Sequence, residues 1–266
     1  MQVLGIAGDG ASTLCERVAP HLDGRVAVVE RRADDDRSAS GESAKRPDGV
    51  DTAYALGDGS WTAVGGDRSL DDVLDDLAAT YDHALLVGFP DASFPTVALG
   101  GAEAANVAIE ASDASAVDVA TVLETIADAE PHVTLETLVE RVKASPRADR
   151  AGAIATFTGR VRTKDGEDDP ETLELTFEKY EGVAEERLRE IESELMEREG
   201  IHEVACFHRT GTLESGEDIV FVVVLAGHRE EAFETVSDGI DRLKDEVPIF
   251  KRETTVEEDF WVHERQ

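Results

Sequence analysis

The sequence predicts an α/β domain over residues 1–128, followed by a second domain of mixed helices and strands over residues 131–266. The chain opens with an apolar run, a glycine-rich turn and a helical pattern, and strand and helix patterns then alternate. The segment DAEP, residues 128–131, breaks a helical pattern and marks the boundary. With 266 residues, 41% of them apolar, the chain is long enough for two cores.

The chain is strongly and evenly acidic. Its formal net charge is −33, with −17 in residues 1–130 and −16 in residues 131–266. Such even acidity indicates adaptation to high salt, and it argues against nucleic-acid binding because phosphates are repelled.

The cysteine content and the hydropathy argue against a disulfide-rich, zinc-binding or membrane-spanning protein. Cys15 and Cys206 are too few and too far apart for a disulfide framework or a zinc site, so we expect two small buried residues, no metal and no cofactor. No apolar run reaches membrane-spanning length, and the N-terminus lacks the basic flank of a signal peptide. We therefore expect a cytoplasmic protein that does not bind membranes.

The opening turn is the first candidate for a binding site. The strand at residues 3–6 is followed by Gly8, Asp9 and Gly10 and by a helical pattern, which is the context of a phosphate-binding loop. The motif G-x-x-x-x-G-K-[ST] is absent, because the loop is about three residues short and Ala11 stands where the lysine belongs. We therefore expect no nucleotide hydrolysis there.

The rest of the first domain continues the alternation. We predict strands at residues 25–30, 52–56, 61–64 and 84–87, helices at 70–77 and 116–127, and a mobile surface loop at 31–50. The segment HALLVGFPD, residues 83–91, in this order of elements resembles the MobB family of P-loop nucleotide-binding proteins of molybdenum-cofactor biosynthesis. That family has an acidic residue before Gly-Phe, where this chain has Val87. The resemblance implies a P-loop-like fold retained without its nucleotide chemistry.

The second domain is predicted from its periodicities. They indicate helices at residues 135–143 and 185–198, and strands at 151–162, 172–180, 204–210, 219–226 and 249–255. We predict a polar loop at 163–170, a hairpin turn at 209–217 and, at 257–265, a strand or turn that packs Phe260 and Trp261. A last helix ends at Pro248, and its predicted buried stripe is Phe233, Val236, Ile240, Leu243 and Val247.

Two cationic pairs are candidate anion sites. Arg160 and Arg162 share a face at a strand end, so they are either a two-armed anion clamp or exposed edge cations. His228 and Arg229 stand where the last helix begins, and the unpaired backbone N–H groups there favour a phosphate. The alternative for His228 is a helix cap without a ligand.

Lysine is scarce, with six lysines against twenty arginines. Lys244 lies at the flank of the apolar stripe and Lys251 on the strand that follows, so a strand folded back beside the helix would bring both amines to one hollow. Alternation puts Glu253 on the face of Lys251, and Phe250 and Arg252 on the other. Because only lysine can lose its proton when buried, the pair is a candidate for chemistry. The alternative is that both are solvated partners of nearby carboxylates.

Four segments resemble, in order and spacing, the large catalytic subunit of molybdopterin synthase, the MoaE family. They are AGAIATFTGRVR, LTFEKYEG, HRTGTLESGEDIVFVVVLAGHREEAFE and DRLKDEVPIFKRE. The resemblance implies an α+β fold, the α/β hammerhead, and a homodimer at the centre of a heterotetramer. It implies a sulfurtransferase that adds two sulfurs to cyclic pyranopterin monophosphate to form the dithiolene of molybdopterin. The sulfur donor is a small ubiquitin-like carrier whose C-terminal Gly-Gly is a thiocarboxylate.

The same resemblance assigns residues to roles. Lys244 and Lys251 match the catalytic lysines, and the substrate-binding positions match Arg160, Val161, Arg162, His228, Arg229, Lys251, Arg252 and Glu253. Arg162 and the His228 helix start are expected to bind the substrate phosphate, and the lysines to hold the thiocarboxylate and transfer protons. Lys244 is the first choice as acid–base residue, because a desolvated amine beside other cations loses its proton readily.

Two other functions are consistent with these features. One is a nucleotide-binding adaptor of molybdenum-cofactor maturation. The other is an acceptor of the ubiquitin-like carrier, conjugated at Lys244 or Lys251.

Overall fold

The computed structural model describes residues 1–31, 47–164, 166, 169–180, 182–256 and 259–262. The chain divides into two compact units, Met1–Thr134 (unit 1) and Leu135–Gln266 (unit 2), a few residues after the predicted break at 128–131. Most of the predicted loop at 31–50, and parts of the loop at 163–170 and the tail at 257–265, lie outside the described residues. Within the described part of the chain, no helix is long and apolar enough to cross a membrane.

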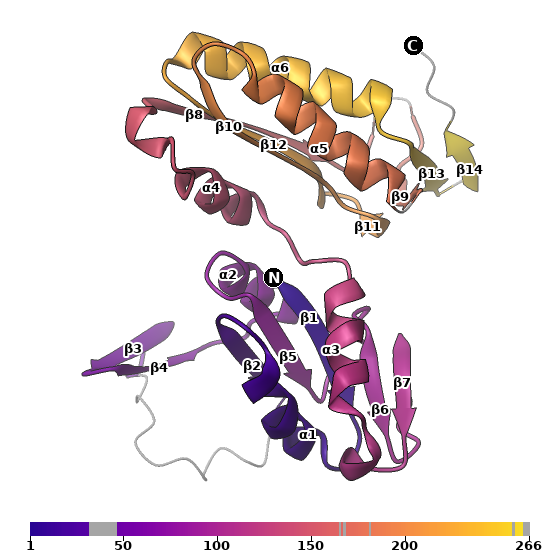
Figure 1. The fold of residues 1–266 in the computed structure, drawn as a ribbon. Helices are drawn as coiled ribbons and strands as arrows, with labels where there is room; N and C mark the ends of the chain where they lie inside the picture. The colour runs from indigo at the N-terminus through magenta and orange to yellow at the C-terminus, as the bar shows by residue number, and fades with distance from the viewer. Residues whose placement is uncertain (32–46, 165, 167–168, 181, 257–258, 263–266) are drawn as a thin grey trace. The chain divides into compact units, whose positions relative to one another are not determined.

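Unit 1 is built on a parallel five-stranded sheet, ordered β2-β5-β1-β6-β7 (Figure 1). Its elements are β1 (Gln2–Ala7), α1 (Ala11–Val18), η1 (Ala19–His21), β2 (Val26–Glu30), β3 (Thr52–Gly57), β4 (Ser60–Gly65), α2 (Leu70–Ala78), β5 (His83–Val87), β6 (Thr96–Leu99), β7 (Val107–Ala111), η3 (Ala114–Ala116) and α3 (Val119–Asp128). Strands β3 and β4 form a separate antiparallel hairpin. The α/β prediction is confirmed for this unit.

Helices cover both faces of the unit 1 sheet. Along β1, Val3 packs in one cluster with Leu74 of α2, whereas Leu4 and Ile6 pack in another with Leu14 of α1. Side chains alternate along a strand, so a strand covered on both sides reads as an unbroken apolar run. This is why the opening run predicted a strand correctly.

Unit 2 is α+β, with two antiparallel sheets ordered β10-β12-β8 and β11-β9-β13-β14. Its elements are α4 (Leu135–Lys143), η4 (Ala148–Arg150), β8 (Ala153–Arg160), β9 (Thr172–Lys179), α5 (Val183–Met196), β10 (Ile201–His208), β11 (Gly211–Glu214), β12 (Asp218–Ala226), α6 (Arg229–Glu246), β13 (Ile249–Thr255) and β14 (Asp259–Val262). The predicted last helix is confirmed, since α6 ends at Glu246 with Val247 as its C-cap, directly before Pro248.

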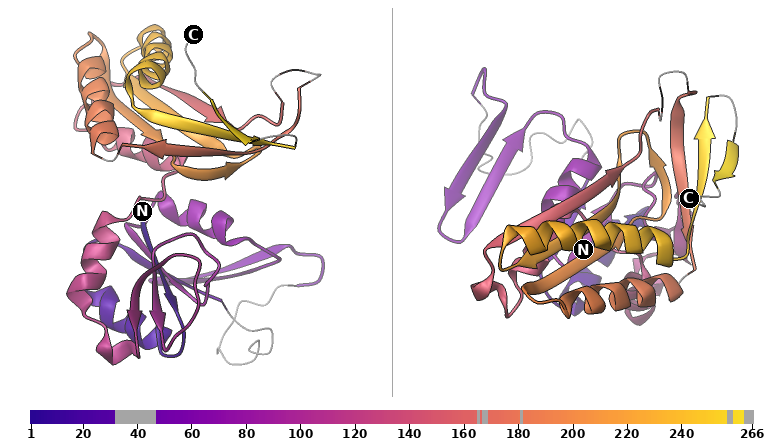
Figure 2. Two further views of the ribbon diagram at one scale, coloured as in Figure 1. Left: turned by 90° about the vertical axis from the view of Figure 1, so that its right-hand side faces the viewer. Right: turned by 90° about the horizontal axis from the view of Figure 1, so that it is seen from above.

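The main core of unit 2 lies between the first sheet and the helix pair α5 and α6, which run side by side (Figures 1 and 2). Gly239 of α6 comes so close to β12 that an added Cβ would lie 3.0 Å from Val222 Cγ1. A smaller cluster surrounds Phe177 of the second sheet. Ile219 and Ile249 pack against both clusters and so join the start of β12 to the start of β13.

Some details of the predicted elements are wrong. Phe233 is 65% exposed, because Ala232 and Val236 take the buried positions in that turn of α6. The predicted hairpin turn at 209–217 contains a strand, β11, which leaves β10 and pairs with β9. Trp261 is 45% exposed on β14 rather than packed.

Glu192 of α5 is a buried carboxylate that accepts a hydrogen bond from Cys206 N at 2.7 Å. We expect Glu192→Ala to lower the free energy of unfolding by about 2 kcal/mol, because it leaves that buried N–H unpaired. Burial is the main cause that raises the Glu192 pKa, ahead of the opposing Cys206 hydrogen bond. A raised folded-state pKa favours the folded protein at low pH, and this contribution is lost as pH rises.

Glu192→Gln cannot ionise, so its stability relative to wild type should increase from pH 4 to pH 7. Denaturant unfolding at both pH values measures the difference. If the difference in stability between Glu192→Gln and wild type is the same at both pH values, the Glu192 carboxyl ionises equally in the folded and the unfolded protein.

Candidate active site

The opening turn of unit 1 is a tight connection into α1. Gly10 is the N-cap of α1 with φ 88°, and a Cβ at Gly8 would lie 2.2 Å from the Leu99 carbonyl oxygen. Ser12 Oγ donates to Glu30 Oε1 at 3.5 Å, which brings a carboxylate to the start of α1. Negative charge at this position opposes phosphate binding. The expectation that unit 1 hydrolyses no nucleotide remains a prediction.

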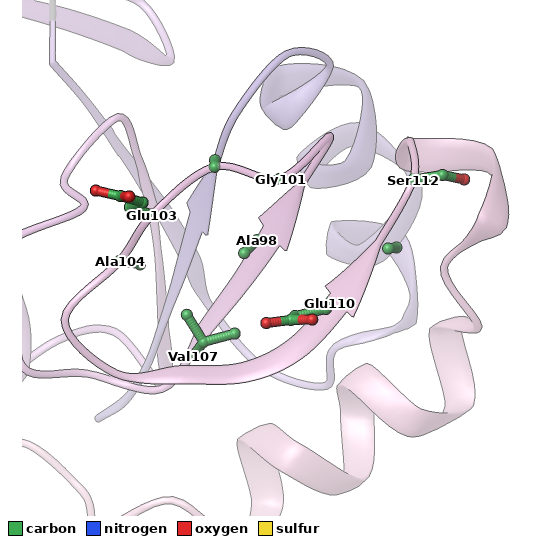
Figure 3. A pocket seen from close by; sticks show the side chains of 9 residues that line it. Ala98, Gly101, Glu103, Ala104, Val107, Glu110 and Ser112 are labelled. Atoms are coloured by element: carbon green, nitrogen blue, oxygen red, sulfur yellow. The ribbon is translucent and has the colours of Figure 1, made fainter.

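A hollow of about 780 Å³ lies along β6 and β7 of unit 1 (Figure 3). Its lining is mostly small residues, with Val107 and the carboxylates of Glu103 and Glu110. It includes none of the predicted site residues, and its two carboxylates make it unsuitable for an anionic substrate.

The cysteines are buried free thiols, as predicted. Burial raises the pKa of Cys15, and it raises the pKa of Cys206 to about 12, with the neighbouring Glu192 adding to the effect. Thiols in this state are poor nucleophiles and metal ligands. Among the described residues, no group of three or more His, Cys, Asp or Glu side chains is placed to hold a metal ion.

Lys251 lies on β13, with Glu253 on the same face of the strand as predicted. Lys251 Nζ is 3.7 Å from Glu253 Oε2, and Thr172 Oγ1 donates to Glu253 Oε1 at 2.5 Å. The Lys251 side chain is 28% exposed and that of Glu253 only 15%. The hydrogen bond from Thr172 thus fixes the Glu253 carboxylate, which pairs with the partly exposed ammonium group of Lys251.

Arg252 points to the other face of β13. It donates to Thr176 Oγ1 at 3.3 Å and pairs in register with Trp261. Phe250 shares this face and meets the ring of Tyr180, with centroids 5.4 Å apart. The alternation predicted for β13 is confirmed on both faces.

Lys244 lies in the last turn of α6 and is exposed. The desolvation expected for this amine is therefore not supplied by the described residues of its own chain. A partner that covers the end of α6 would have to supply it.

Arg160 and Arg162 do not stand as a matched pair on one strand, because β8 ends at Arg160. Arg160 Nε lies 3.2 Å from Asp218 Oδ1, and its Nη2 donates to the carbonyl oxygen of Gly216. Val161 is buried, and its N–H donates to Glu217 O at 2.8 Å. Arg160 and Val161 are thus tied to the turn before β12, which places the exposed Arg162 beyond the strand end.

His228 is the N-cap of α6, and the helix begins at Arg229, as predicted. The His228 side chain makes no capping hydrogen bond. The backbone donors of the helix start suit an anion, whereas Glu230 and Glu231 in the first turn of α6 oppose one.

The predicted site residues do not converge within one chain. From Arg229 to Lys244 the helix rises by about 22 Å, at 1.5 Å per residue. Ala153 pairs with Ala226, whereas Arg160 pairs with Asp218, so the two ends of β8 are about 23 Å apart. Figure 1 shows that β13 lies beside the C-terminal end of α6. The site is thus split into two parts.

We call these parts the lysine end and the histidine end. The lysine end consists of Arg160, Val161, Arg162, Lys244, Lys251, Arg252 and Glu253. The histidine end consists of His228 and Arg229. The prediction from sequence placed these residues in one hollow because it used the ends of the helix and the strands and not the distance between those ends.

Comparisons with known proteins identify relatives of this chain. Residues 129–246 match the model of the MoaE family, described as MoaE protein. The chain is 61% identical over 269 residues to the probable molybdopterin synthase of Haloferax volcanii, covering 100% of each chain. A solved MoaE protein from Burkholderia ambifaria is 35% identical, covers 50% of this chain and 85% of its own, and has a TM-score of 0.42. A MobB homologue from Bacillus stearothermophilus is 17% identical, covers 48% and 99%, and has a TM-score of 0.36.

Proposed function

The chain belongs to the MoaE family of molybdopterin synthase catalytic subunits, which act in molybdenum-cofactor biosynthesis, and from this premise we propose a specific sulfur transfer. Unit 2 takes sulfur from the thiocarboxylate of a small ubiquitin-like carrier and adds it to cyclic pyranopterin monophosphate. Two carriers each give one sulfur to form the dithiolene. Each carrier leaves as a carboxylate after water cleaves its acyl–sulfur bond.

The observation that carries this proposal is the lysine end. Two of only six lysines flank the corner where α6 turns into β13, and Glu253 holds Lys251 at the surface. Ammonium groups there can hold a thiocarboxylate, and an amine can exchange a proton at the carbon that receives sulfur. Arg162 and the start of α6 are proposed to bind the substrate phosphate.

The distance between the lysine end and the histidine end within one chain supports a homodimer. We propose that the histidine end of one protomer faces the lysine end of its partner, so that a twofold axis produces two equal sites. The partner would also cover Lys244, which its own chain leaves exposed. One carrier at each site then makes a heterotetramer.

The test is to incubate the full-length protein with the pterin substrate and a thiocarboxylated ubiquitin-like carrier. We expect the dithiolene product, measured by mass spectrometry, with two carriers consumed for each product. The same carrier ending in an ordinary carboxylate is the control and should give none. A lack of product from the thiocarboxylated carrier would reject the proposed function.

A further inference from the structure

Lys179 is the last residue of β9, and it shares a face of the second sheet with Lys251. In the antiparallel pairing of β9 with β13, Ile249 lies opposite Lys179 and Lys251 lies opposite Phe177. Residues two apart on a strand, and residues directly opposite, point to the same face. Lys179 and Lys251 are therefore diagonal neighbours, with Cβ atoms about 7 Å apart.

This register also brings Lys179 close to the end of α6. Its partner Ile249 is the first residue of β13, directly after the corner at Val247 and Pro248. Lys244 lies one turn before that corner. Three of the six lysines of the chain thus lie at the C-terminal end of α6, at the end of β9 and near the start of β13.

Each of the two sheet lysines is paired with a carboxylate among the described residues. Lys179 Nζ lies 2.8 Å from Glu185 Oε1, and Glu185 Oε2 also accepts from Gly182 N at 2.6 Å at the start of α5. The Lys179 side chain is 20% exposed, and Glu185 is 38% exposed. A partly exposed ion pair contributes little to stability, so an incoming anion can take the place of Glu185.

The side chains behind the lysines carry no charge at neutral pH. Phe177 is buried, and its ring meets that of His208, with centroids 4.9 Å apart. Burial, together with the positive charge of Lys179, lowers the His208 pKa to about 4 despite its bond to the Arg209 carbonyl oxygen. Apart from the carboxylates of Glu185 and Glu253, Lys179 and Lys251 thus lie next to uncharged side chains. Surroundings of low polarity strengthen the interaction of an ammonium group with an anion.

We propose that Lys179 is a third ammonium group of the lysine end and that it binds the negatively charged terminus of the carrier tail by exchanging Glu185 for it. This inference rests on the proposed function. The substrate phosphate is proposed to bind Arg162 and the histidine end, whereas Lys179 is a diagonal neighbour of Lys251 and lies opposite Ile249, the first residue of β13. The anion expected at the lysines is the carrier's thiocarboxylate, or the carboxylate that remains after sulfur transfer.

The test is calorimetric titration of the full-length protein with a ubiquitin-like carrier ending in a Gly-Gly carboxylate, and with the same carrier ending in a Gly-Gly amide. Lys179→Gln should weaken binding of the carboxylate form about tenfold, the effect of one charge-assisted hydrogen bond, and leave the amide form unchanged. Lys179→Arg should keep most of the affinity. Equal affinities of wild type and Lys179→Gln for the carboxylate form would overturn the inference.

Two control variants separate binding from structure. Glu185→Gln removes the same ion pair but keeps the ammonium, so it should bind the carboxylate form at least as tightly as wild type. If it weakens binding as much as Lys179→Gln does, the role of Lys179 is structural and the inference is wrong. Lys143→Gln removes a lysine paired at 2.6 Å with Glu140 on α4, and it should have no effect.

Failure of the inference differs from failure of the proposed function. A wild-type protein that forms product, with a Lys179→Gln variant that binds the carrier equally well, rejects only the role of Lys179. A wild-type protein that forms no product rejects both.

Discussion

A mixed dimer with Lys251→Ala on one protomer and Arg229→Ala on the other is expected to keep about half of the wild-type activity, although a homodimer of either variant is inactive. The reason is the length of α6, which separates Arg229 from Lys244 and the adjoining β13 within one chain. If each site takes its lysines from one protomer and its His-Arg pair from the other, this mixed dimer has one intact site. Co-expression with two affinity tags isolates the mixed dimer for assay.

The reciprocal dimer is the matched control. A protomer that carries both substitutions, paired with a wild-type protomer, loses one essential residue from each shared site and should be inactive. A site contained in one chain predicts the opposite result, half activity for this dimer and none for the first. The two dimers have the same composition, so their comparison does not depend on how much each substitution destabilises the fold.

Replacement of Lys244 by alanine should lower the single-turnover rate of dithiolene formation by about 10²- to 10⁴-fold, the usual contribution of a general acid or base. Lys244→Arg keeps the positive charge but cannot exchange a proton near neutral pH. It should therefore bind the carrier with nearly wild-type affinity and still be slow. Rapid-quench kinetics and carrier titration measure the two effects separately.

Lys143→Ala is the control for this experiment, because it removes an exposed lysine of the same unit. Its rate should stay within about twofold of wild type, as expected for a surface substitution. A Lys244→Ala variant with near wild-type product formation would remove Lys244 from the acid–base role and leave Lys251 as the remaining candidate.

Prediction of the fold succeeded where local patterns are strong. The strand, tight turn and helix at the start of unit 1, and the stop of α6 before Pro248, are both present. Strands β6 and β7 were not predicted, because both are short and neither shows a clear alternation. Phe233 was assigned to the core from spacing alone, although a small residue, Ala232, sits closer to the centre of the buried face.

The local placement of the candidate site residues was predicted correctly, whereas their arrangement in space was not. Lys251 and Glu253 share a face as their spacing of two requires, and His228 begins a helix as predicted. The placement of Arg160 and Arg162 on one strand was wrong, because β8 ends at Arg160 and the Val161 backbone pairs with a turn far along the chain. The position of Lys179 beside Lys251 was not predicted, since it depends on the register between β9 and β13.

The sequence by itself determined which residues are candidates for the site and which local element carries most of them, because side-chain type and periodicity are properties of a few neighbouring residues. Only the tertiary structure decided which of them meet. Strand register placed Lys179 beside Lys251, and helix length kept Arg229 about 22 Å from Lys244. Both depend on contacts between segments far apart in the chain, and these follow from packing around a shared core.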